Sequence, residues 1–186
     1  MMILTGIALV LILIAVVSII GIYNNLIVFK NRVKNAYSQI EVQLKRRHDL
    51  IPNLLESVKG YMSHEKETLE KVIQARNIAS NMTTDVKTQS QNENMLSGTL
   101  KSLFALSENY PDLKANQNFI SLQEELATTE NKIAFARQFY NDSVMQHNNK
   151  KEIFPNNIIA TSFNFQDFVM FEIEDEAEKE NIQIKF

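Results

Sequence analysis

The chain has 186 residues, and its 19 Lys and Arg against 22 Asp and Glu give a net charge of −3. That balance argues against a dedicated nucleic-acid-binding protein, which needs a basic excess. The absence of cysteine excludes disulfides, cysteine–zinc sites and thiol nucleophiles. With only 4 Gly and 3 Pro, the chain has too few turn residues for many short strands, so the composition predicts an all-α protein.

The first 29 residues carry no charged side chain. Residues 3–22 form an apolar run interrupted by only four small or weakly polar residues, and about 20 helical residues match a hydrocarbon core of about 30 Å. A cleaved signal peptide is the alternative, but it needs a basic start, a shorter apolar run and a small-residue cleavage site. None of the three is present, so we predict that residues 1–29 are an uncleaved transmembrane anchor.

Charged residues begin just after this run. Tyr23 stands where an aromatic interface residue belongs, and Lys30, Arg32 and Lys34 form a membrane-proximal basic group. The positive-inside rule then predicts a single-pass protein whose N-terminus lies outside and whose C-terminal domain lies in the cytoplasm.

Residues spaced alternately by four and three run from the anchor into the polar part of the chain. The spacing keeps its phase through Pro52, so we predict one long helix that is kinked there because proline cannot donate a hydrogen bond to the carbonyl of His48. The alternative is that Asp49 caps a separate second helix. The spaced positions are Ile19, Tyr23, Leu26, Lys30, Val33, Tyr37, Ile40, Leu44, Arg47, Ile51, Leu54, Val58 and Tyr61.

Three further helices follow in the predicted order. A turn at residues 60–63, with Ser63 as the expected N-cap, leads to a helix ending near residue 79, and the polar stretch 80–94 is predicted to be a loop. Helices are then expected over 94–109 and 116–149, separated by the breaker Tyr110-Pro111-Asp112. Short connections between amphipathic helices predict an antiparallel four-helix bundle over residues 30–154, with the transmembrane helix continuous with its first helix.

Residues 155–186 form a third predicted segment, aromatic at first and acidic at its end. Its aromatic side chains are expected to pack back on the bundle. The alternative is an exposed patch that docks a partner or a neighbouring subunit. The aromatic residues concerned are Phe163, Phe165, Phe168 and Phe171.

Arg47 occupies a position that the helical spacing buries. A buried guanidinium needs a carboxylate partner, and Glu130, between the small residues Ala127 and Ala134, offers one. We therefore predict that Arg47 or Arg46 bonds Glu130; the alternative is that these charges reach solvent from the bundle edge. The predicted structural network comprises Arg46, Arg47, Asp49, Glu108, Glu130, Arg137 and Asn141, with Asp49 or Glu108 meeting Arg137.

Catalytic and metal-binding motifs are missing from the sequence. His64-Glu65 resembles the start of H-E-x-x-H, but residue 68 is Thr, and no Glu-x-x-His occurs. Phosphate-binding glycine loops and nucleophile elbows are also absent. We expect no catalytic, cofactor-binding or metal-binding residues, no cofactor and no enzyme activity.

Several runs closely resemble the LemA family of membrane-anchored bacterial proteins. They are QLKRRHDLIPNLLE at 43–56, ENYPDLKAN at 108–116, TENKIAFARQFYN at 129–141 and the Phe154-Pro155 element. The resemblance covers nearly the whole chain and implies one N-terminal transmembrane helix, a bundle of long helices and location in the bacterial cytoplasmic membrane. It implies no known enzyme activity. Some relatives are linked to shaping membranes, and others occur beside membrane proteases.

These observations predict a non-enzymatic scaffold that self-associates as a homo-oligomer and organises the membrane or its proteins. The expected partners are the lipid bilayer and further copies of the chain, with no nucleic acid. The alternative is an adaptor or regulator of another membrane protein, such as a protease. A bundle with a ligand-binding or hidden active site is the third hypothesis.

Overall fold

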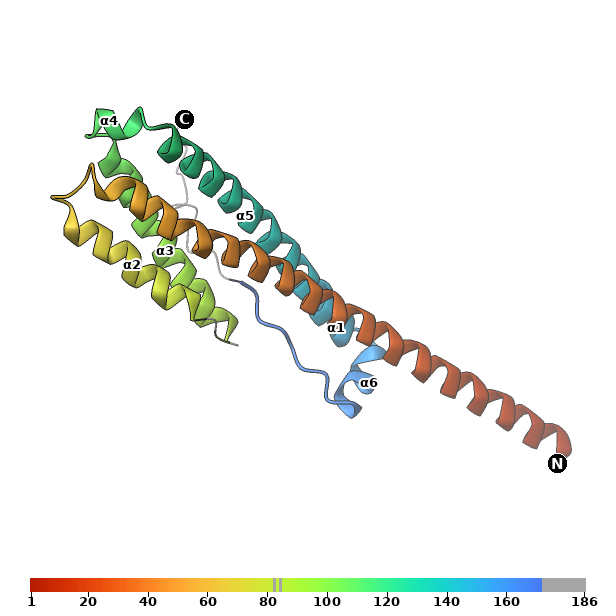
Figure 1. Cartoon of the computed structure of the whole chain (residues 1–186). Helices are drawn as coiled ribbons and strands as arrows, with labels where there is room; N and C mark the ends of the chain where they lie inside the picture. The colour runs from red at the N-terminus through yellow and green to blue at the C-terminus, as the bar shows by residue number, and fades with distance from the viewer. Residues whose placement is uncertain (82, 84, 172–186) are drawn as a thin grey trace, which may run out of the picture. The chain divides into compact units, whose positions relative to one another are not determined.

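The computed structural model describes residues 1–81, 83 and 85–171, and every regular element in this part is a helix. The all-α prediction is therefore confirmed, whereas the acidic tail lies outside the described residues. Figure 1 shows the helices α1 (Met2–Lys59), α2 (Lys66–Ser80), α3 (Val86–Ser107), α4 (Pro111–Lys114), α5 (Gln117–Glu152) and α6 (Asn156–Ser162).

Helix α1 runs for 58 residues, with Pro52 inside it. The prediction that the helix persists through Pro52 is confirmed, and the alternative of two helices meeting at Asp49 is wrong. A bend at Pro52 stays a prediction. Among the described residues, α1 is the one helix long and apolar enough to cross a membrane, and none of its apolar window is buried.

Burial along α1 follows the predicted spacing from Leu26 to Val58, where every predicted position is buried or half-buried. Ile19 is exposed, and so is Tyr61, because α1 ends at Lys59 and Tyr61 lies in the following turn. Among the fully buried positions of this spacing, Arg47 is the one that carries a charge. These buried positions are Leu26, Val33, Ile40, Leu44, Arg47, Ile51, Leu54 and Val58.

The described chain forms two compact units. Unit 1 contains residues 1–40 and 136–170, and unit 2 contains residues 41–135 together with Phe171. Helices α1 and α5 contribute residues to both units. The predicted boundaries after residues 29 and 154 stay predictions.

The apolar core of unit 2 draws on five helices. Residues of α1, α2, α3, α4 and α5 meet there because each helix buries one stripe at three- and four-residue spacing. The core consists of Ile51, Leu54, Val58, Met62, Val72, Ala75, Ala79, Leu96, Leu100, Leu103, Leu113, Phe119 and Leu126.

Two predicted helix starts are wrong. Glu65, not Ser63, is the N-cap residue of α2, and it makes no capping hydrogen bond through its side chain. Helix α3 begins at Val86 instead of near residue 94, because Asp85 caps it by accepting hydrogen bonds from the backbone amides of Lys87 and Thr88. Much of the expected loop is therefore helical.

In unit 1, aromatic and amide contacts join α1 to α5. The rings of Tyr37 and Tyr140 lie 5.6 Å apart between centroids, and Arg32 donates a hydrogen bond of 2.9 Å to Gln146. Burial, together with the neighbouring Tyr37, raises the pKa of Tyr140 to about 12. The Tyr140 hydroxyl is thus a neutral donor, and it bonds the carbonyl of Val169 at 2.9 Å.

Candidate functional site

Arg47 is the centre of a buried ionic network in unit 2. Its side chain is 1% exposed, and its guanidinium reaches two carboxylates from different helices, Glu93 of α3 and Glu130 of α5. The Arg47–Glu130 nitrogen–oxygen distance is 2.5 Å, and the same guanidinium nitrogen donates to the Ser97 hydroxyl at 2.8 Å. One cation on α1 therefore ties α3 and α5 to the same place.

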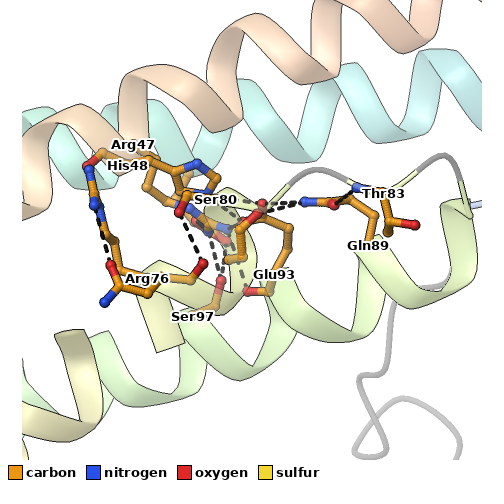
Figure 2. A network of polar contacts seen from close by, with 11 residues as sticks. Arg47, His48, Arg76, Ser80, Thr83, Gln89, Glu93 and Ser97 are labelled. Carbon is orange, nitrogen blue, oxygen red and sulfur yellow. Dashed lines mark hydrogen bonds and ion pairs between the residues drawn. The ribbon is translucent and has the colours of Figure 1, made fainter. Parts of the chain in front are cut away.

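Glu93 is the most deeply buried acid of this network. His48 Nε2 lies 3.0 Å from one of its oxygens, and Gln89 donates to it at 2.9 Å. Burial alone would raise the pKa of the Glu93 carboxyl, but the hydrogen bond with His48 and the charge of Arg47 outweigh it, so the net pKa is lowered. Figure 2 shows Arg47 and His48 facing Glu93 from α1.

Backbone groups extend the network to α2. Arg76 donates to the carbonyl of His48 at 3.3 Å, and Gln89 donates to the carbonyl of Ala79 at 3.1 Å (Figure 2). The backbone amide of Thr83 in turn donates to the Gln89 side chain at 3.2 Å. These contacts join α2 to α1 through Arg76, and join α3 to the end of α2 and to the α2–α3 connection through Gln89, in addition to the apolar packing of α2.

The predicted pairing of Arg47 with Glu130 is present, but part of its reasoning is wrong. Glu130 is 45% exposed, so it lies at the edge of the network. Ala127 and Ala134, which were expected to face a neighbouring helix, are both exposed. Arg46 pairs instead with Glu125, at 2.7 Å, on the surface.

The other members of the predicted network are dispersed. Asp49 is exposed, and Glu108 forms an ion pair with Lys114 of α4. Arg137 and Asn141 belong to α5 within unit 1, where Arg137 is buried. The pairing of Arg137 with Asp49 or Glu108 stays a prediction.

Sequence reasoning missed Glu93, Gln89 and the role of His48. Glu93 and Gln89 lie in a stretch without apolar residues at helical spacing, which favoured a loop. A weak signal was present, since Gln89 and Glu93 continue the helical spacing of the apolar residues Leu96, Leu100 and Leu103 toward the start of α3.

A cavity of about 210 Å³ adjoins the network in unit 2. Apolar residues of α3 and α5 form much of its wall, with Arg47 and Glu130 at its polar edge. Within the described residues, no group of three or more His, Asp or Glu could hold a metal ion. The arrangement neutralises buried charge and joins α1, α3 and α5.

A second cluster lies in unit 1, where α1 leaves its apolar run. The Tyr23 ring centroid is 4.8 Å from that of Phe163 and 5.8 Å from that of Phe165. The Lys30 ammonium lies 5.8 Å from the centre of the Phe165 ring. Of the three cations predicted to lie near the membrane, Lys30 therefore contacts an aromatic ring, Arg32 is exposed but bonds Gln146, and Lys34 is exposed.

The aromatic segment after α6 is held along α5. Asn148 bonds the backbone of Phe168 in both directions, donating to its carbonyl at 2.9 Å and accepting from its amide at 3.1 Å. The Phe168 ring meets His147 edge-on, and Lys151 pairs with Asp167. Of the four aromatic residues predicted to pack back or to dock a partner, Phe171 is buried and Phe163 remains the most exposed.

Comparison with known proteins shows the family of the chain. The LemA family model matches residues 36–186. Protein LemA of Metamycoplasma hominis is 28% identical over 153 residues, which cover 82% of this chain and 70% of that protein. The matched region contains the ionic network and the aromatic segment, and the family model covers most of the chain. The chain therefore belongs to the LemA family.

Proposed function

We propose that this chain is a non-enzymatic, membrane-anchored scaffold that self-associates and organises the bilayer or its proteins. The observation that carries the proposal is the continuity of α1. Its residues 2–21 are all exposed and largely apolar, and the same helix then supplies buried residues from Leu26 to Val58. Such a helix connects a membrane anchor to the folded part of the chain without a linker.

We further propose that α1, α2, α3 and α5 form an antiparallel four-helix bundle. In unit 2, Tyr61 accepts a hydrogen bond from Asn116, and Arg47 binds Glu130. The later residue just after α1 thus meets the earlier residue just before α5, which is the order expected of antiparallel helices. In unit 1, Tyr37 meets Tyr140 and Arg32 meets Gln146 in the same sense. Both sets of contacts support antiparallel packing of these two helices.

The basic residues after the anchor support a cytoplasmic C-terminal domain. Arg32 and Lys34 are exposed, and cations beside a membrane span favour the cytoplasmic side. A C-terminal fluorescent fusion should be active in the bacterial cytoplasm, whereas a C-terminal phosphatase fusion should be silent. The opposite pattern would overturn the proposed orientation.

A shallow surface groove in unit 1 supports self-association. It is lined by the exposed apolar residues Val28 and Phe139 and by polar side chains of Asn31, Arg32 and others from α1. Apolar side chains beside hydrogen-bonding groups are typical of a surface that a second protein copy covers.

The test is the subunit number of the full chain in nanodiscs prepared directly from membranes, measured by mass photometry. We expect oligomers that Phe139→Asp dissociates. Met145→Asp is the matched control, because Met145 is equally exposed on α5 but does not line the groove. Monomers in native nanodiscs, or stoichiometric capture of a different membrane protein, would contradict self-association.

A further inference from the structure

We propose that the corner between α5 and α6 is a second membrane contact, which inserts apolar side chains into the headgroup region of a lipid bilayer. The inference rests on the membrane anchoring in the proposed function and adds a surface to it. Its side chains are Ile153, Phe154, Ile158 and Phe163.

These four side chains are exposed although all are large and apolar. Ile153 is 50% exposed, Phe154 79%, and Ile158 and Phe163 55% each. They lie within 11 consecutive residues: Ile153 and Phe154 in the turn between α5 and α6, Ile158 on α6, and Phe163 directly after it. Large apolar side chains exposed together in so short a segment mark a site that another apolar phase covers.

The corner is tied to the point where α1 would leave the bilayer. Tyr23 directly follows the apolar run 3–22, and the Phe163 ring lies 4.8 Å from the Tyr23 ring between centroids. Figure 1 shows α6 beside this part of α1. If residues 3–22 span the hydrocarbon core, Phe163 therefore stands at the boundary between lipid and water, where aromatic side chains are favoured.

The charges around the corner are mostly cationic, although the exposed Glu152 directly precedes Ile153, and they fit an anionic lipid surface. Helix α6 has no charged residue, so its insertion desolvates no ionised group. Lys30 next to Phe165, Arg32 on α1 and Lys150 at the end of α5 supply cations on the same unit. Apolar side chains flanked by cations are the combination that binds in the plane of an anionic membrane surface.

We favour lipid over a second copy of the chain as the occupant of this surface. The reason is that the surface adjoins the apolar run of α1, which the proposed anchor already places in lipid. Every residue of α1 from 2 to 21 is exposed, and Tyr23 joins this apolar surface to Phe163. The bilayer that covers the first surface reaches the second without a further partner.

The test uses single-cysteine labelling, because the chain contains no cysteine. Ile158→Cys carries an environment-sensitive fluorophore, and the full chain is reconstituted into vesicles of phosphatidylcholine and phosphatidylglycerol with brominated acyl chains. We expect blue-shifted emission that the brominated lipid quenches. Phe154→Cys is a second labelling site with the same expectation, and retained helical circular dichroism verifies folding.

Two labelled positions serve as controls. A fluorophore at Leu13→Cys reports insertion of the anchor, and one at Ile73→Cys, which is exposed on α2, reports a side chain in water. Quenching at 13 without quenching at 154 or 158 would overturn the membrane contact and leave the anchor intact. Absence of quenching at 13 as well would overturn the anchor itself. Blue-shifted emission at 158 that lipid does not quench would assign the surface to a protein partner and also overturn the inference.

Discussion

Units 1 and 2 use the same two helices but hold them with different chemistry. In unit 2, α1 packs Ile51, Leu54 and Val58 into the apolar core and adds one buried charge, Arg47, which Glu93 and Glu130 neutralise. In unit 1, α1 meets α5 through tyrosine rings and an Arg32–Gln146 hydrogen bond, and Asn148 holds the aromatic segment by its backbone. A buried ion pair favours one arrangement of the helices, at a high cost of desolvating the ions. Contacts between rings and amides carry no net charge, so the surface around them stays apolar.

The comparison predicts that the largest loss of stability comes from unit 2. Glu93→Ala should lower the free energy of unfolding by about 3–5 kcal/mol. The reason is that the buried Arg47 guanidinium would keep only one carboxylate partner, the half-exposed Glu130. Replacing Arg47 and Glu93 together by leucine should cost much less, since no buried charge remains. Chemical unfolding of the full chain in detergent, followed by circular dichroism, measures both. A Glu93→Ala loss no greater than that of the double variant would contradict the ionic role.

Much of unit 2 could be predicted from the sequence, and Glu93 shows where prediction stopped. The three- and four-residue spacing located the buried face of α1 through Pro52, since apolar burial is a local pattern. The first turns of α3 bury Gln89, Ser90 and Glu93, which look like a solvated stretch. Their burial depends on cations and carbonyls from α1 and α2, which are distant in the sequence, so the local spacing could not identify the groups that pair with them.

The same limit applied in unit 1. The aromatic residues from 163 to 171 were recognisable, and their packing against the bundle was expected. Their actual partners, Tyr23 for Phe163 and the Asn148 side chain for Phe168, depend on how the chain turns after α6. Nothing in the sequence pointed to the role of Asn148, because an asparagine that bonds a distant backbone looks the same in a sequence as one that faces solvent.

Asn148 provides the next largest expected effect. Asn148→Ala removes two hydrogen bonds to the Phe168 backbone, so we expect a loss of about 2 kcal/mol, confined to the contact of the aromatic segment with α5. Amide hydrogen exchange at Phe168 should accelerate, while exchange in α3 stays unchanged. The exposed neighbour Asn149→Ala is the control. Equal acceleration in α3 would show that the two units do not respond independently.

Glu130→Ala should have a smaller effect than either change. The Glu130 side chain is 45% exposed and Arg47 keeps Glu93, so the loss should be about 1 kcal/mol or less, as for solvent-exposed ion pairs. Glu124→Ala, an exposed acid on the same helix, should be neutral. Denaturant unfolding would separate these variants from Glu93→Ala, and an equally large loss for Glu130→Ala would show that Glu130 is the principal counter-ion.

The smallest expected effect is the pH dependence of the network. The folded-state pKa of Glu93 lies below its ordinary value of 4.5, so its ionised form stabilises the fold above that pH, and this contribution disappears as pH falls through the lowered pKa. The effect is small because burial opposes the influence of His48 and Arg47 on the same carboxyl. Glu93→Gln cannot titrate, so the difference in unfolding free energy between it and the unmodified chain should narrow below about pH 4.5. Asp85 and Glu67, whose pKa values are also lowered, titrate in both proteins and cancel in this difference. A difference that widens in acid would mean that the protonated form of Glu93 is the one the fold prefers.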